Sequence, residues 1–190
     1  MSEKELQLVD KSIKGDLKAY TRLVKRYEGR VYNFLLKMTK NREDAEDLLQ
    51  KTFVRAYEKL NTFRGKSSFS TWLFSIALNF YLMKKRVEKD IKLETLDSAI
   101  DMEGLAHPQA TVDWTERPDE ALDKKEIKEI LEKAIEKLPP IYRGVFILKD
   151  IEGFSHEEIS KMLDISIPAV KTRLLRARLF LRSQLSDYFH

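Results

Sequence analysis

The 190-residue sequence contains no cysteine and only three histidines, His107, His156 and His190, which lie far apart. The lack of cysteine excludes a disulfide scaffold, a thiolate metal site and a cysteine nucleophile. The scattered histidines do not form the cluster that a multi-histidine metal centre needs. We therefore expect no metal ion and no other cofactor.

Long apolar runs are also missing. The longest uncharged stretch, residues 67–83, includes six Ser, Thr or Asn residues and is too short and too polar to span a bilayer. The first fifteen residues mix acids and bases around no apolar core, so they do not resemble a signal peptide. No phosphate loop, nucleophile elbow or zinc spacing is present. These absences predict a cytoplasmic protein that does not insert into the membrane, has no catalytic residues and takes no small-molecule substrate.

Charge is unevenly distributed, although the net charge is only +4. Residues 1–86 carry 19 Lys and Arg against 10 Asp and Glu, whereas residues 87–119 carry 3 against 9. Residues 167–190 are basic again, with 5 against 1. Two basic blocks separated by an acidic one indicate two surfaces that bind polyanions, joined by a segment that does not.

Apolar residues recur with a helical period over residues 1–86. The pair Gly15–Asp16 is expected to end a first helix and cap a second, which Gly29 is expected to interrupt. Asn41 is a good N-cap for a long helix that follows, and a further helix is expected from about residue 70 to residue 86. We therefore expect a helical domain over residues 1–86.

The helical period is lost over residues 87–119, which contain two prolines, one glycine and nine acids. A segment of 33 residues is too long for a packed loop inside one domain. The period returns from residue 120. The sequence thus predicts an all-α fold with two small helical domains, residues 1–86 and 120–190, joined by an acidic linker over residues 87–119.

Residues 155–182 have the pattern of a helix-turn-helix. A capping box begins at Ser155, and a three-residue turn that starts at Asp164 precedes the final helix. That helix has an apolar face of Val170, Leu174, Ala177 and Leu181, and its other positions include Lys171, Thr172, Arg173, Arg176, Arg178 and Arg182. A buried apolar face fixes the orientation of a recognition helix, and arginines on the other face can reach guanine edges and phosphates. We interpret it as a DNA-reading helix; a surface helix with solvated cations is the alternative.

Six of the 19 aromatic residues fall within residues 63–81, which basic residues bracket on both sides. Aromatic faces beside cations suit unpaired bases, and each stacked base contributes about 1–3 kcal/mol. The alternative is a hydrophobic core, because Trp72, Ile76 and Phe80 recur at helical spacing. The two interpretations are compatible if some rings face inward and others outward.

Acidic residues cluster at Asp44, Glu46 and Asp47. Paired catalytic carboxylates or a metal site would need a basic or histidine partner, and none accompanies them in the sequence. Acids in the first turn of a helix are stabilised by the helix dipole, which explains their presence without a catalytic or metal-binding role. A protein-binding face is the functional alternative.

Taken together, these motifs resemble bacterial sigma factors. The stretches that resemble the second domain of these factors are residues 41–50, Phe53, Ala56, Tyr57, 63–65, 69–73, 76–77 and Asn79. Those that resemble the fourth domain are residues 138–139, 157–163 and 170–178. Two such domains with a short linker are typical of the extracytoplasmic-function (ECF, group 4) sigma factors of the sigma-70 family.

The resemblance implies a transcription initiation factor without enzymatic activity, which binds core RNA polymerase and directs it to promoters. It implies four contacts: the clamp helices of the beta-prime subunit, the beta flap, promoter DNA and an anti-sigma factor. The residues it assigns to polymerase binding are Asp44, Asp47, Leu48, Gln50, Lys51, Phe53 and Tyr57. Those it assigns to the minus-10 element, which melts, are Phe63, Arg64, Lys66, Ser67, Ser68, Phe69, Thr71, Trp72, Asn79 and Lys84. Those it assigns to the minus-35 duplex are Ser166, Ala169, Lys171, Thr172, Arg173, Leu175 and Arg176.

Three positions depart from the family pattern. Lys51 stands where many relatives carry Glu, Met83 where many carry Asp, and Asp164 where a Gly is often found. The first bears on polymerase binding and the second on minus-10 preference. A free-standing helix-turn-helix regulator that binds duplex DNA without polymerase is the alternative function. It accounts for residues 155–182 but not for the aromatic segment or the acidic helix start.

Overall fold

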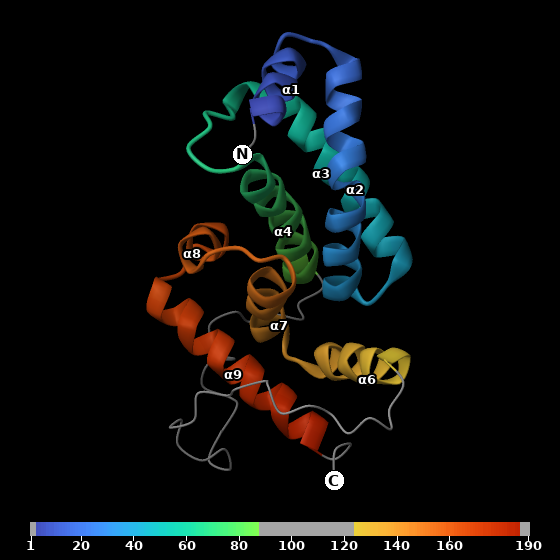
Figure 1. Cartoon of the computed structure of the whole chain (residues 1–190), viewed down its shortest axis with the longest axis vertical. Coiled ribbons are helices and arrows are strands. Elements are labelled where there is room, and N and C mark those ends of the chain that lie inside the picture. The colour runs from blue at the N-terminus through green and yellow to red at the C-terminus, as the bar shows by residue number, and fades with distance from the viewer. Residues whose placement is uncertain (1–2, 88–123, 187–190) are drawn as a thin grey trace.

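The computed structural model describes residues 3–87 and 124–186, and every regular element within these ranges is a helix. Figure 1 shows two groups of helices, α1 to α4 in the N-terminal bundle and α6 to α9 in the C-terminal bundle. The predicted all-α fold is confirmed. The predicted linker lies outside the described residues, apart from Val87 at the end of α4.

The N-terminal bundle contains α1 (Glu3–Ile13), α2 (Leu17–Thr39), α3 (Arg42–Lys59), the short 3-10 turn η1 (Leu60–Thr62) and α4 (Phe69–Val87). The predicted caps are confirmed. The Asp16 carboxylate accepts hydrogen bonds from the backbone N–H groups of Lys18 and Ala19, at 2.9 and 3.0 Å. The Asn41 side chain accepts one from the N–H of Asp44 at 3.1 Å. These caps fix where α2 and α3 begin.

The expected interruption at Gly29 is wrong, because α2 runs without a break from Leu17 to Thr39. One glycine inside a helix costs only about 1 kcal/mol relative to alanine. The buried residues Tyr27 and Val31 continue the same apolar stripe across it. Packing of that stripe outweighs the local preference of the glycine.

Helix α4 settles how the aromatic segment is divided. Phe69, Phe74 and Tyr81 are at most 1% exposed and lie in the core. Trp72 and Phe80 are partly buried and pack against the edge of the core. The inward face is therefore offset from the stripe expected through Trp72 and Phe80. The core interpretation therefore holds in part, because some rings form the core and others reach the surface.

The C-terminal bundle contains α6 (Lys124–Lys137), α7 (Pro140–Phe146), the π-helical turn η2 (Ile147–Ile151), α8 (His156–Leu163) and α9 (Ile167–Ser186). The capping box is confirmed, since Ser155 and Glu158 exchange hydrogen bonds of 3.1 and 2.9 Å. Asp164 ends α8 in the left-handed conformation at φ 54°, which aspartate tolerates. The predicted apolar face of α9, which begins at Val170, is buried throughout.

The two bundles pack directly against each other and share one continuous hydrophobic core. Figure 1 shows α8 beside α4 and α7 below the lower end of α4, with α9 below them. Phe74 of α4 meets Phe154 of the C-terminal bundle edge to face, with ring centroids 5.0 Å apart. The DNA-reading surfaces expected on separate domains are therefore held close together in this arrangement.

None of the helices within the described ranges is both long and apolar enough to cross a membrane.

Candidate nucleic-acid and polymerase interfaces

Helix α3 has two opposite faces. Its buried face, which includes Ala45, Thr52 and Ala56, packs on α2 and α4. Its exposed face carries the expected polymerase contacts Asp47, Gln50, Lys51 and Tyr57 at the i, i+3 and i+4 spacings of one helix surface. Val54 lies in the middle of this face and is 59% exposed. Sequence reasoning missed Val54, although its position between Gln50 and Tyr57 could have identified it.

Two of the ion pairs on α3 involve expected polymerase contacts. Lys51 Nζ lies 2.7 Å from the Asp47 carboxylate, so the cation that departs from the family pattern neutralises an acid on the same face. Asp44 pairs with Lys84 of α4 at 3.1 Å. This second pair connects an expected polymerase contact to an expected minus-10 contact.

Two of the expected polymerase contacts lie deeper. Leu48 is 2% exposed and belongs to the core, where it supports the face and presents no surface of its own. Phe53 is half-buried, and its carbonyl accepts a hydrogen bond of 2.5 Å from the Tyr20 hydroxyl. Burial raises the pKa of this Tyr20 hydroxyl, which stays a donor. The Tyr20 ring also packs at a tilt of 57° against the Tyr57 ring, with ring centroids 4.9 Å apart, and so supports one end of the exposed face.

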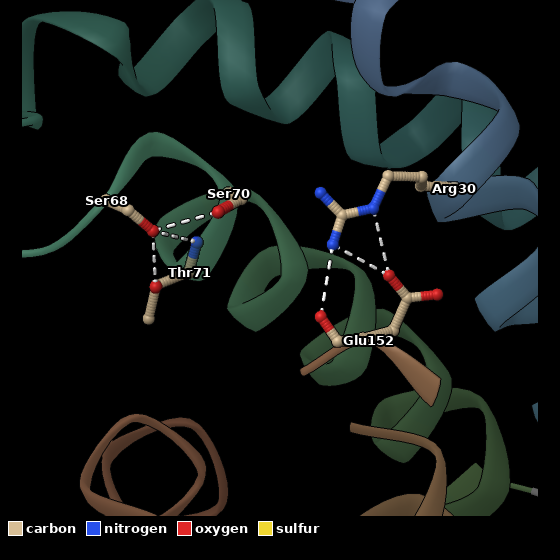
Figure 2. A network of polar contacts seen from close by, with 5 residues as sticks. All are labelled: Arg30, Ser68, Ser70, Thr71 and Glu152. Carbon is tan, nitrogen blue, oxygen red and sulfur yellow. Dashed lines mark hydrogen bonds and ion pairs between the residues drawn. The ribbon is translucent and has the colours of Figure 1, made fainter. Parts of the chain in front are cut away.

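The loop before α4 exposes Arg64 and Lys66 to solvent. The Ser68 hydroxyl accepts a hydrogen bond from the N–H of Thr71 at 3.1 Å, which caps the start of α4 (Figure 2). The same hydroxyl shares hydrogen bonds with Ser70 at 2.9 Å and with the Thr71 hydroxyl at 2.6 Å. Ser67 and Ser68 are half-buried. The local role of Ser68 is therefore to begin the helix.

Phe63, Phe69 and Trp72 form one aromatic cluster, with ring centroids 5.3 to 5.7 Å apart. Phe69 is 1% exposed and lies beneath the other two rings. Phe63 and Trp72 are partly exposed, and the exposed Arg64 and Lys66 follow Phe63 in the loop before α4. Partly exposed rings in a basic segment suit single-stranded nucleic acid.

The remaining minus-10 candidates lie in different surroundings. Asn79 is exposed on α4, two turns after Trp72. Thr71 is only 5% exposed, because its hydroxyl donates a hydrogen bond to the carboxylate of Glu158 on α8. Burial alone would raise the pKa of Glu158, but hydrogen bonds from Thr71 and Ser155 outweigh it and lower this pKa. The carboxylate is thus held in its charged form against α4.

Helix α9 exposes part of the expected minus-35 surface. Ser166, Lys171 and Thr172 are exposed, and Leu175 is 41% exposed. Ser166 caps the helix, since its hydroxyl accepts a hydrogen bond of 3.3 Å from the N–H of Ala169, which is half-buried. The first two turns of α9 thus present the polar atoms that a recognition helix directs into the major groove.

The arginines of α9 are not equivalent. Arg173 and Arg176 are half-buried, and Arg176 donates a hydrogen bond of 3.1 Å to the Tyr142 hydroxyl on α7. Arg178 forms a two-pronged ion pair with Asp150 of η2, at 2.7 and 3.0 Å. This pair raises the pKa of Arg178. Arg178 therefore braces α9 against η2, although the sequence alone places it among the cations available to DNA.

Within residues 3–87 and 124–186, no three histidine, aspartate or glutamate side chains gather closely enough to hold a metal ion. The acidic cluster at Asp44 and Asp47 is engaged in the ion pairs described above. The fold and its helix-turn-helix together define a helical DNA-binding protein.

Comparison with known proteins identifies this class. Residues 23–90 match the family described as Sigma-70 region 2, and residues 128–181 match Sigma-70, region 4. The chain is 36% identical to the ECF RNA polymerase sigma factor SigW of Bacillus subtilis, over 92% of each chain. It is 32% identical to the ECF RNA polymerase sigma-E factor of Escherichia coli K12, over 90% of this chain and 88% of that one.

Solved structures show the same fold. The sigma factor RpoE of Bartonella quintana, in complex with the anti-sigma factor NepR, superposes with a TM-score of 0.65. It is 25% identical and covers 90% of this chain and 98% of that chain. CnrH, in complex with the cytosolic domain of CnrY, has a TM-score of 0.68 at 22% identity, over 97% of this chain and 99% of that one.

The chain belongs to the ECF sigma factors of the sigma-70 family. It is a transcription initiation factor that binds RNA polymerase and directs it to particular promoters. The match to region 2 covers the aromatic segment and the acidic start of α3. These are the features that a free-standing helix-turn-helix regulator leaves unexplained, so that alternative is not favoured.

Proposed function

We propose that three surfaces of the described helices have separate roles in transcription initiation. Residues 1–86 would form the domain that binds core polymerase and the minus-10 element, and residues 120–190 the domain that binds the minus-35 element. Residues 87–119 would join them. The observation that carries this proposal is the division of α3 and α9 into a buried apolar face and an exposed polar face.

The exposed face of α3 is the proposed contact with the clamp helices of the beta-prime subunit. Val54 and Tyr57 are large apolar residues that remain 59% and 42% exposed, with Asp47, Gln50 and Lys51 beside them. Apolar side chains in a polar rim are typical of a protein interface. The acids at the start of the helix favour a basic partner surface.

The aromatic cluster before and within α4 is the proposed minus-10 site. Phe63 and Trp72 would stack on bases that leave the duplex, while Arg64 and Lys66 hold the backbone. Extruding a base costs a few kcal/mol, and stacking returns about 1–3 kcal/mol for each base. Asn79 would contact the strand further along α4, and Lys84 would do so after releasing Asp44.

The first two turns of α9 are the proposed minus-35 reader. Lys171 and Thr172 are available to DNA in the observed arrangement, and Arg173 and Arg176 would extend towards the groove from half-buried positions. Arginine reads guanine through two hydrogen bonds, whereas lysine acts on phosphates mainly as a charge. The C-terminal domain would also contact the beta flap, on the strength of the family resemblance.

Further partners follow from the comparisons. RpoE and CnrH were solved in complex with an anti-sigma factor and with the cytosolic domain of CnrY, respectively. We infer that an anti-sigma factor also binds this chain. We further infer that it acts in the cytoplasm, where core polymerase lies, and that it has no enzymatic activity of its own.

Charge reversal on α3 tests the polymerase site. Asp47→Lys should weaken binding to core polymerase at least tenfold, because it reverses a charge on the exposed face. Glu28→Lys makes the same charge change on an exposed position of α2 and should leave this affinity unchanged. Fluorescence anisotropy of a labelled chain, titrated with sigma-free core polymerase, measures both. Equal affinities for the two variants would remove the proposed site from α3.

A further inference from the structure

Most cations of the N-terminal bundle lie outside the surfaces described so far. Residues 1–86 carry 19 Lys and Arg. The residues assigned to polymerase or to the minus-10 element include only four of them, Lys51, Arg64, Lys66 and Lys84. The basic block that the sequence shows is therefore largely unexplained by those surfaces, and several of the remaining cations lie on α2.

Four cations form one row along α2, which we call the basic ridge. Lys18, Arg22, Arg26 and Arg30 recur at every fourth position, so their side chains follow one another on one side of the helix. All four are exposed, whereas Tyr27 and the rest of the apolar stripe of α2 are buried. The basic ridge is about 18 Å long at about 1.5 Å per residue.

The charges of the basic ridge are largely uncompensated. Within residues 3–87 and 124–186, Arg30 is the only member of the ridge that forms an ion pair, with the Glu152 carboxylate at 2.9 Å (Figure 2). Lys18, Arg22 and Arg26 are left as three like charges at i and i+4 spacing, which destabilise a helix. A row of this kind is relieved when a negatively charged partner binds along it.

The acids close to the basic ridge are engaged elsewhere or face away from it. The Asp16 carboxylate caps α2, and Glu5 of α1 accepts a hydrogen bond from the Tyr27 hydroxyl. Glu5 is 4% exposed, so its carboxylate is buried beneath the surface. Glu28 is the one acid within α2, and it lies two residues from Arg26, a spacing at which side chains do not face each other.

The basic ridge lies beside the aromatic cluster of the proposed minus-10 site. The Cζ atom of Arg26 lies 6.0 Å from the centre of the Tyr27 ring. The Tyr27 ring lies 5.5 Å from that of Phe69, which packs beneath Phe63 and Trp72. Three contacts therefore lead from the ridge to a ring that is expected to stack on a base. Figure 1 shows the corresponding helices, α2 and α4, side by side.

The composition of this side of α2 favours nucleic acid over protein as the partner. Between residues 18 and 30, the exposed positions of α2 carry Lys, Arg, Thr, Glu or Gly and no large apolar side chain. Protein interfaces have an apolar centre, whereas phosphate contacts need only cations. From Lys18 to Arg26 the ridge spans about 12 Å, which three or four nucleotides cover at about 3.4 Å each.

We propose that Lys18, Arg22 and Arg26 bind the phosphates of the single strand whose bases stack on Phe63 and Trp72. The inference rests on the proposed minus-10 site and extends that site from α4 to α2. The loop before α4 holds the backbone where the bases leave the duplex, and the basic ridge holds the next three or four nucleotides. Phosphate contacts carry no sequence information, so the ridge adds affinity without changing promoter choice.

Paired substitutions test the basic ridge. Arg22→Ala with Arg26→Ala removes two charges from it, whereas Arg22→Lys with Arg26→Lys keeps both. Lys133→Ala with Lys161→Ala, at exposed positions of α6 and α8, removes two charges elsewhere and is the matched control. Holoenzyme is assembled from each variant and sigma-free core polymerase. Fluorescence anisotropy at several salt concentrations then measures its affinity for a single strand that carries the minus-10 element of a promoter that the parent holoenzyme transcribes.

The salt dependence should separate phosphate contacts from stacking. Two phosphate contacts contribute about 1.4 to the slope of log affinity against log salt, at about 0.7 each for a single strand. The alanine pair should lose this amount and bind about 25-fold more weakly at about 0.1 M salt, but equally well at about 1 M. The lysine pair and the control should keep the parent slope, because lysine binds phosphate as a charge. Trp72→Ala should instead weaken binding by the same factor at every salt concentration.

An unchanged slope for the alanine pair would overturn the proposal and leave the basic ridge to solvent or to an acidic protein. An equal loss of slope in the control or in the lysine pair would overturn it as well. Failure of the proposed minus-10 site gives a different result. In that case Trp72→Ala would bind the strand as tightly as the parent, and the parent would bind it no more tightly than an oligothymidylate of the same length. The slopes measured on that oligothymidylate would still decide whether the ridge binds phosphates.

Discussion

Two cations on α9, Lys171 and Arg178, give the sharpest test of how this helix works. Each contributes one positive charge, and they lie seven residues apart, or about two helical turns. Lys171 is exposed at the start of the helix, whereas Arg178 is paired with Asp150. Replacing either with alanine removes the same charge from the same helix. We expect the Lys171 variant to change DNA binding and the Arg178 variant to change thermal stability.

The structure sets the size of each effect. Lys171→Ala removes an exposed cation, so the free energy of unfolding should change by less than about 0.5 kcal/mol. Loss of one phosphate contact should reduce the slope of log affinity against log salt by about 0.9. Arg178→Ala breaks a pair whose side chains are 40% and 25% exposed, so solvent screening limits its cost to about 1 kcal/mol. That cost corresponds to a fall in Tm of roughly 2–4 °C for a chain of this size.

Thermal unfolding and promoter binding by the holoenzyme at several salt concentrations measure these two effects. Lys133→Ala removes an exposed cation from α6 and serves as the matched control, which should change neither quantity. A lower Tm with an unchanged salt slope for Lys171→Ala would refute the reasoning. An equal loss of salt slope in both α9 variants, with no change in Tm for Arg178→Ala, would refute it as well.

Three further predictions concern other surfaces. Lys51→Glu replaces the ion pair with Asp47 by a contact between two carboxylates. Calorimetry should show a loss of less than about 1 kcal/mol in the free energy of unfolding. Fluorescence anisotropy should show tighter binding to core polymerase. Trp72→Ala should impair promoter opening, measured by permanganate footprinting, and leave core binding intact; normal opening would exclude a role for this ring. Because the pKa of Glu158 is lowered, its contribution to stability is complete above its unfolded value of about 4.3 and is lost as the pH falls through the folded value. Glu158→Gln should therefore show a weaker loss of thermal stability than the parent chain between about pH 5 and pH 3, and identical profiles would contradict this account of the Thr71 contact.

Local signals in the sequence were sufficient for most helix boundaries. Asp16, Asn41 and Ser155 were identified as caps because short polar side chains satisfy backbone N–H groups only a few residues away. The apolar face of α9 that begins at Val170 is equally predictable from the sequence, since helical spacing determines which side is buried. Gly29 misled the prediction because its helix is stabilised by packing over its whole length.

Contacts between distant segments could not be predicted in this way. The pairing of Arg178 with Asp150 spans 28 residues, and that of Arg30 with Glu152 spans 122. The sequence shows these residues only as charges and does not show which of them meet. The same limit explains why Thr71 was expected at a DNA surface, whereas the observed arrangement buries it against the C-terminal bundle.

The most direct test of the account is run-off transcription on a bacterial promoter library, with sigma-free core polymerase in the presence and absence of this chain. We predict transcripts that appear only when the chain is added, from promoters that share two spaced upstream elements. With a cognate core and a folded preparation, the absence of such transcripts together with no binding to core polymerase would contradict the account. Specific binding to duplex DNA without polymerase would then favour a free-standing regulator.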